Sequence, residues 1–210
     1  MFQRIIIILL MSLCTQAKAD AASDKLLTFF SETQTMRAEF VQTIQSKDKK
    51  IPDENRGVLT MQRPGKFVWD YQYPYQQQII ADGKQLWIYD VDLDQAIVKP
   101  LDMVLGDTPA VLLSDTTSIT ERFKVEQTPE LKGDTGLDWL RLTPKKSDIG
   151  FEQILLAFKG TDLQEMHLTD AFGQVTRLVF SNLEKNPKID ASLFNFVPPD
   201  GVDVIRGQNQ

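Results

Sequence analysis

Cysteine and histidine are nearly absent from this chain of 210 residues, which has one residue of each, Cys14 and His167. A Ser–His or Cys–His nucleophile pair would have to use His167, which stands between Met166 and Leu168 in a strand-like pattern. No Gly-x-Ser-x-Gly motif accompanies it. We therefore interpret His167 as an ordinary strand residue, and the sequence favours a protein that is not an enzyme.

Motifs for metals and phosphates are also missing. The series Asp90-x-Asp92-x-Asp94 resembles the start of a calcium loop. That loop requires glycine at its sixth position and glutamate at its twelfth, where this chain has Gln95 and Leu101. A solvated hairpin turn explains the three aspartates better. We expect no metal site and no cofactor.

Long apolar runs are absent except at the N-terminus. Arg4 precedes an almost unbroken apolar segment over residues 5–13, and small residues at positions 17 and 19 suit a signal peptidase. The segment is about half as long as a membrane-spanning helix. The sequence predicts a cleaved signal peptide, residues 1–19, followed by a soluble, exported protein of residues 20–210.

Cys14 falls within this signal peptide. Lipid attachment needs a small residue before the cysteine, and here the preceding residue is the bulky Leu13. We therefore expect that Cys14 is removed rather than acylated. The mature chain then has no cysteine, which excludes disulfides and thiolate metal sites.

Basic residues are fewer than acidic ones, 23 against 29. Cleavage removes Arg4 and Lys18, so the net charge moves from −6 to −8. An acidic protein is poorly suited to sequence-independent binding of nucleic acid, and an anionic membrane surface does not attract it. We expect no nucleic-acid partner.

Period-two patterns dominate the mature chain. Met36, Ala38 and Phe40 form one such series, and turn signals at residues 63–65 and 82–83 separate later ones. Further strands are expected near residues 121–127, 137–143, 151–158, 163–169 and 174–182. Short helices are expected near residues 23–30, 109–113 and 190–194. Because helices this short cannot stand alone, each must lay an apolar face on the sheet of a single domain.

Several expected strands are apolar on both faces. Residues 67–69 and 86–89 are examples, with sequences Phe-Val-Trp and Leu-Trp-Ile-Tyr. Two buried faces would suit a sandwich core, and they would equally suit a curved sheet around an apolar cavity. Composition alone leaves both open.

One continuous set of motifs resembles a known family. The most specific piece is Arg-Pro-x-x-Phe-x-Trp at residues 63–69, followed by a hairpin. The other matching segments are residues 73–74, 79–84, 86–90, 108–113, 142–145 and 194–202. In this order and spacing they resemble the LolA family of periplasmic outer-membrane lipoprotein carriers, over nearly all of the mature chain.

The resemblance implies a mainly β fold. This would be an incomplete, open antiparallel β-barrel of about 11 strands, with a lid of about three short helices over an apolar cavity. It implies a soluble, monomeric periplasmic chaperone of a Gram-negative bacterium. Its cargo would be acylated lipoproteins, received from an inner-membrane ABC transporter of the LolCDE type and passed to the outer-membrane receptor LolB. LolB is itself a lipoprotein, so the absence of a lipid-attachment signal favours the carrier.

The resemblance also implies site residues. Arg63 matches the family arginine that hydrogen-bonds backbone carbonyls of the lid, and Phe67 matches an aromatic used in the cavity. The candidate cavity residues are Phe67, Trp69, Trp87, Tyr89, Phe29, Phe30, Met36, Phe40, Leu112 and Leu113.

Two other functions stay open. The same fold could carry another lipid or glycolipid, or sense mislocalised lipoproteins, although a sensor usually has a second domain and an anchor. A periplasmic enzyme on a β scaffold would have to use His167.

Overall fold

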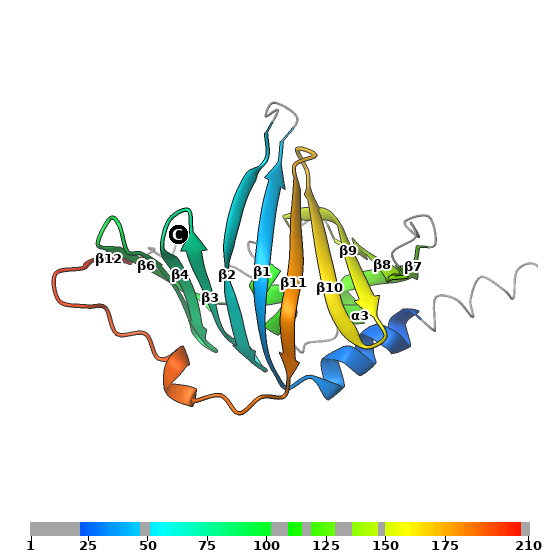
Figure 1. The fold of residues 1–210 in the computed structure, drawn as a ribbon, viewed down its shortest axis with the longest axis horizontal. Coiled ribbons are helices and arrows are strands. Elements are labelled where there is room, and N and C mark those ends of the chain that lie inside the picture. Colours follow the sequence, from blue (N-terminus) through cyan, green and yellow to red (C-terminus); the bar gives the residue numbers. More distant parts are fainter. Residues whose placement is uncertain are drawn as a thin grey trace, which may run out of the picture.

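The computed structural model describes residues 22–46, 51–101, 109–114, 119–128, 136–146 and 150–206. The expected signal peptide, with Cys14, lies outside these residues. The described chain folds into one long, strongly curved sheet with short helices at one end (Figure 1). No helix in these ranges is long and apolar enough to cross a membrane.

The sheet has twelve strands in the order β12-β6-β5-β4-β3-β2-β1-β11-β10-β9-β8-β7. Their bounds are β1 (Thr35–Gln45), β2 (Asp53–Gln62), β3 (Lys66–Tyr73), β4 (Gln77–Asp82), β5 (Gln85–Asp90), β6 (Gln95–Pro100), β7 (Phe123–Gln127), β8 (Asp138–Pro144), β9 (Phe151–Lys159), β10 (Asp162–Asp170), β11 (Val175–Lys185) and β12 (Asp203–Arg206). The edge strands β7 and β12 do not pair with each other, so the sheet is open. The expected open, mainly antiparallel β fold is confirmed.

The chain departs from the expected pattern at its end and near residue 120. A twelfth strand, β12, exceeds the expected eleven, and it pairs parallel with β6. The predicted strand over 121–127 begins as the short helix α3 (Ile119–Arg122) and continues as β7. The predicted helix near 190–194 is the 3-10 helix η3 (Ala191–Phe194), which Asp190 caps by accepting a hydrogen bond from the Ser192 amide.

Alternating side chains decide which face of the sheet is buried. Met36, Ala38 and Phe40 on β1 are buried in the main apolar cluster, whereas Arg37 and Glu39 point to the opposite side. Adjacent strands keep this alternation in register. The sheet therefore has a buried concave face and a more polar convex face, which is typical of antiparallel sheets.

The N-terminal helix, residues 22–32, covers the concave face. Ala22, Leu26, Phe29 and Phe30 follow helical spacing and are all buried, whereas Leu27 on the other side is exposed. The rings of Phe29 and Phe158 meet edge to face at 5.4 Å. Because this helix and the sheet bury the same apolar cluster, the helix is held by tertiary packing.

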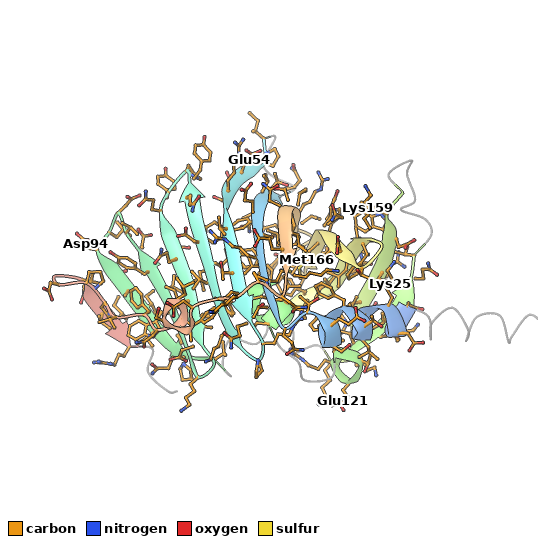
Figure 2. The ribbon with its side chains drawn as sticks, turned by 60° about the horizontal axis from the view of Figure 1, so that its bottom comes forward. Lys25, Glu54, Asp94, Glu121, Lys159 and Met166 are labelled. Atoms are coloured by element: carbon orange, nitrogen blue, oxygen red, sulfur yellow. The ribbon has the colours of Figure 1, made fainter. Side chains whose placement is uncertain are left out.

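Two further contacts complete this end of the molecule. Helix α2 (Pro109–Ser114) buries Leu112 and Leu113 in the same cluster. Lys25 on the N-terminal helix forms an ion pair with Asp138 at the start of β8, on the side of the sheet away from Asp94 (Figure 2).

After β11 the chain runs along the convex side of the sheet to β12 (orange to red in Figure 1). Phe196 in this segment contacts the rings of Trp87 and Tyr89, with centroids 5.3 Å away in each case. The segment thus covers apolar surface on β5 that would otherwise face solvent.

Candidate functional site

Arg63 lies in the turn between β2 and β3, at the end of the sheet where the helices are. Its side chain is almost completely buried, with 4% of its surface exposed. Its Nε donates a hydrogen bond to the carbonyl of Leu113 in α2 at 3.0 Å. Its Nη1 donates to the carbonyl of Phe30 at 3.2 Å and to that of Thr33, both at the end of the N-terminal helix. One guanidinium therefore joins two helices to one turn of the sheet.

The backbone of the turn strengthens this connection. The Arg63 amide donates to the carbonyl of Gln34 at 2.8 Å, and the Gly65 amide donates to that of Ser114 at 3.0 Å. Gly65 has a φ of 69°, a left-handed conformation that glycine adopts without steric strain. The turn thus reaches the C-terminal ends of both helices through main chain as well as side chain.

The chemistry suits both partners. The last carbonyls of a helix lack intrahelical hydrogen-bond donors, and a guanidinium offers five N–H groups. The guanidinium also lies over the rings of Phe30 and Phe29, 4.4 and 5.3 Å from their centroids. Burial lowers the pKa of Arg63 to about 10, so the group remains charged at neutral pH. Among the described residues it forms no ion pair, and its Nη2 has no hydrogen-bond partner.

Eight of the ten candidate cavity residues meet in one apolar cluster between the sheet and the helices. They are Phe29, Phe30, Met36, Phe40, Phe67, Trp69, Leu112 and Leu113. The rings of Phe40 and Trp69 lie 4.9 Å apart in the middle of the concave face. The sequence therefore identified most of the apolar interior.

Trp87 and Tyr89 do not belong to this interior, so the prediction that they line it is wrong. Their neighbours on β5, Leu86 and Ile88, pack against the apolar cluster on the concave face. Because successive side chains of a strand point to opposite faces, Trp87 and Tyr89 lie on the convex face. There both rings contact Phe196. Both faces of β5 carry apolar side chains, because the main apolar cluster covers one face and Phe196 covers the other.

Two side chains that the sequence analysis did not single out lie near the opposite end of the interior. Gln42 follows Phe40 on the concave face of β1 and is buried, and its Oε1 accepts a hydrogen bond of 2.8 Å from the hydroxyl of Tyr71. Burial raises the pKa of Tyr71 to about 12, which keeps the hydroxyl protonated. A polar residue within the alternating apolar series of β1 is the signal that could have identified Gln42.

The single histidine lies in a surface network on the convex face. His167 Nε2 is 3.0 Å from Glu165 Oε2, and Arg177 donates to both carboxylate oxygens of Glu165. Burial acts to raise the pKa of Glu165, but the hydrogen bonds from Arg177 and His167 outweigh it, so the pKa is below its usual value. No group of three or more potential metal-ligating His, Cys, Asp or Glu side chains occurs in the described ranges.

Comparison with known proteins places this arrangement in a family. The model of the family described as outer membrane lipoprotein carrier protein LolA matches residues 31–197. The chain belongs to the LolA family. Among its relatives, the outer-membrane lipoprotein carrier protein of Nitrosomonas europaea is 43% identical over 207 residues, which cover 97% of this chain and 98% of the relative. That of Methylobacillus flagellatus is 43% identical over 182 residues and 87% of both chains.

Solved structures share the LolA fold at low sequence identity. A LolA superfamily protein from Nitrosomonas europaea has a TM-score of 0.50 at 14% identity, over 84% of this chain and 97% of its own. A conserved protein from Thermus thermophilus has a TM-score of 0.57 at 12% identity, over 90% of this chain and 99% of its own. These similarities concern the fold alone.

Proposed function

We propose that this protein is a periplasmic carrier that binds the acyl chains of lipoproteins released from the inner membrane and delivers them to an outer-membrane receptor. It acts as a single binding domain, residues 20–210, after residues 1–19 are removed, and it works as a monomer without catalysis. The observation that carries the proposal is the buried Arg63, which joins two short helices to the sheet over a large apolar interior. The relatives named as lipoprotein carriers support it.

Arg63 is the latch of this carrier in our proposal. The two helices that it contacts also cover the apolar cluster, so breaking its hydrogen bonds frees both helices to move away from the sheet. Phe29, Phe30 and Leu113 would leave the interior with them and make room for hydrocarbon. These side chains fill the space in the closed state, and acyl chains take their place in the loaded state.

Energetics explain why such a lid is useful. Burying acyl methylenes contributes about 0.8 kcal/mol each, so three long chains reach on the order of 30 kcal/mol as an upper limit. A carrier that retained all of this free energy would not release its cargo. Opening the Arg63 contacts and moving apolar side chains out of the interior lowers the net affinity, so a receptor with a slightly better cavity can accept the cargo without ATP.

The proposed partners follow from the family resemblance. A transporter of the LolCDE type at the inner membrane would supply the cargo, and LolB at the outer membrane would receive it. The alternative cargo is a different lipid or glycolipid on the same fold.

A release assay tests the proposal. Spheroplasts that retain newly made outer-membrane lipoproteins are mixed with the purified mature protein, its Arg63→Leu variant, or Arg56→Leu as a control. Arg56 lies on β2, the strand that precedes the Arg63 turn, but it is exposed and forms an ion pair with its near neighbour Glu54. We expect the wild type and the control to bring lipoprotein into solution as a one-to-one complex, and the latch variant to accept cargo but transfer it poorly to LolB. Wild type that releases no lipoprotein but binds extracted lipids would refute this cargo.

A further inference from the structure

A second feature of the interior lies at the end of the sheet opposite the Arg63 turn. A pocket of about 520 Å³ opens there between the last residues of β1, β3 and β5 and the first of β2 and β4. Its lining includes Gln42, Tyr71 and Asn55. Glu54, the neighbour of Asn55 on β2, is seen at this end of the sheet, away from the N-terminal helix (Figure 2). The pocket is therefore separate from the latch and remains open while the helices are closed.

The pocket connects directly to the apolar interior. Tyr71 meets Phe40 edge to face at 5.3 Å, and Phe40 in turn lies 4.9 Å from Trp69. Gly57 stands between Phe40 and Tyr71 in the strand register, and its lack of a side chain lets the two rings approach. A chain that enters through the pocket would pass along these rings into the cluster.

The Gln42–Tyr71 pair is the polar element at this entrance. Gln42 is 8% exposed, and its Oε1 accepts a hydrogen bond of 2.8 Å from the Tyr71 hydroxyl. Among the described residues, the Nε2 of Gln42 has no hydrogen-bond partner. A carboxamide offers two N–H donors. The Nε2 of Gln42 is not among the enclosed unpaired atoms of the described residues, and Gln42 lines the pocket, so these donors are accessible to a ligand. The pair therefore presents the N–H groups of Gln42 at the boundary between the apolar interior and the solvent. A carbonyl oxygen of a ligand is a suitable acceptor for them.

The charge of the pocket restricts the ligand further. Asp90 and Asp92 line the rim, and no basic side chain occurs among the lining residues described. Carboxylates repel phosphate and other anions, and they accept hydrogen bonds without donating any. The pocket thus disfavours an anionic phospholipid head group. It suits a lipid whose acyl chains end in uncharged ester or amide carbonyls.

We propose that Gln42 and Tyr71 form a subsite for the ester or amide carbonyls that join the acyl chains of a lipoprotein to its acylated cysteine. This inference rests on the proposed carrier function. It adds to that function a site that fixes how far the acyl chains enter the interior. Methylenes beyond the carbonyl lie along Tyr71, Phe40 and Trp69, whereas the peptide remains outside at the acidic rim. The subsite distinguishes neutral acylglyceryl groups from charged phospholipids, which are far more abundant in membranes.

Binding of two matched probes tests the subsite. One probe is a synthetic triacylated lipopeptide, and the other is its analogue in which both glycerol esters are replaced by ethers. Affinities are measured by displacement of a fluorescent fatty acid from the mature protein. We expect the wild type to bind the ester probe about fivefold more tightly than the ether probe, the effect of one neutral hydrogen bond.

Variants locate the source of this preference. Gln42→Leu, and the double variant Gln42→Leu/Tyr71→Phe, which leaves no buried polar group unpaired, should bind both probes equally. Gln72→Leu is the control, because Gln72 neighbours Tyr71 on β3 but is exposed, donates a hydrogen bond to Asp70, and is not among the lining residues described for this pocket. It should keep the preference for the ester probe.

The outcomes separate the two proposals. If the wild type binds both probes with equal affinity, or the Gln42 and Tyr71 variants keep the preference, the subsite is wrong and the carrier function stands. If the wild type binds neither probe, the carrier function itself fails.

Discussion

Replacing Arg63 by leucine should loosen the helices without unfolding the sheet. Leucine retains apolar bulk but removes every donor, so the carbonyls of Leu113, Phe30 and Thr33 lose their common partner. The contacts of β9, β10 and β11 with one another do not involve Arg63. The perturbation is therefore local to residues 22–32 and 109–114.

The magnitude follows from two opposing contributions. Three hydrogen bonds from a charged donor stabilise by about 1.5–3 kcal/mol each, hence about 4.5–9 kcal/mol together. Against this, burial lowers the pKa of Arg63 from 12.5 to about 10. At about 1.4 kcal/mol per pKa unit this corresponds to an opposing free energy of about 3 kcal/mol. Subtracting this opposing free energy leaves a net contribution to lid closure of about 1.5–6 kcal/mol, and we use a value of about 3 kcal/mol from this net range.

Amide hydrogen exchange measures this closure directly. A loss of about 3 kcal/mol should speed exchange in the helices on the order of a hundredfold, whereas amides of β9 to β11 should change little. Arg56→Leu should leave both regions as in the wild type. Equal acceleration in helices and sheet would mean that Arg63 supports the whole fold rather than the lid. Unchanged exchange in the helices would refute the latch.

Three further predictions concern the sheet. Gly57→Ala should lower the melting temperature, because a Cβ there would lie 1.9 Å from the backbone oxygen of Asp70. Overpacking of this kind costs about 1–3 kcal/mol, which calorimetry would detect as a decrease of roughly 2–10 °C, and an unchanged value would show that the strands separate easily. Glu165→Gln should destabilise by about 1 kcal/mol at neutral pH. Since the folded pKa of Glu165 is lowered, its stabilisation is present above the ordinary carboxyl pKa and is lost as the pH falls through the folded value. Denaturant unfolding from pH 7 to 3 should show the two proteins converging at the acid end, and a constant difference would exclude the ion pair with Arg177 as its cause. His167→Ala should leave lipoprotein release unchanged, whereas loss of release would revive an enzymatic interpretation.

The sequence was sufficient for the parts of the fold that local patterns determine. Alternation identified β1 and its buried series Met36, Ala38 and Phe40, and the turn at Arg63 was identified by its composition. The resemblance added the expectation that Arg63 contacts helix carbonyls, which the geometry matches. Each of these features depends on a few neighbouring residues or on one specific motif.

Features that depend on distant segments could not be predicted in the same way. In β5 both faces are apolar, so alternation cannot tell which face is the interior. The answer depends on Phe196, more than a hundred residues later, which covers Trp87 and Tyr89. Likewise β12 has only four residues, and its parallel pairing with β6 follows from the path of the preceding segment. The Gln42–Tyr71 pair joins β1 and β3 across the intervening strand β2, and this proximity depends on the register of both strand pairs.

The open edges of the sheet also affect how wide its concave face can become. In a closed barrel, strand number and stagger fix the diameter, so the interior has one volume. Among the described strands, β7 and β12 end the sheet without pairing with each other, so hydrogen bonds do not close these strands into a ring of fixed circumference. Small changes in the twist between neighbouring strands can widen or narrow the concavity while every strand pair stays intact. Acyl chains of unequal length can then be accommodated by elastic bending of the sheet, without a dedicated pocket for each chain.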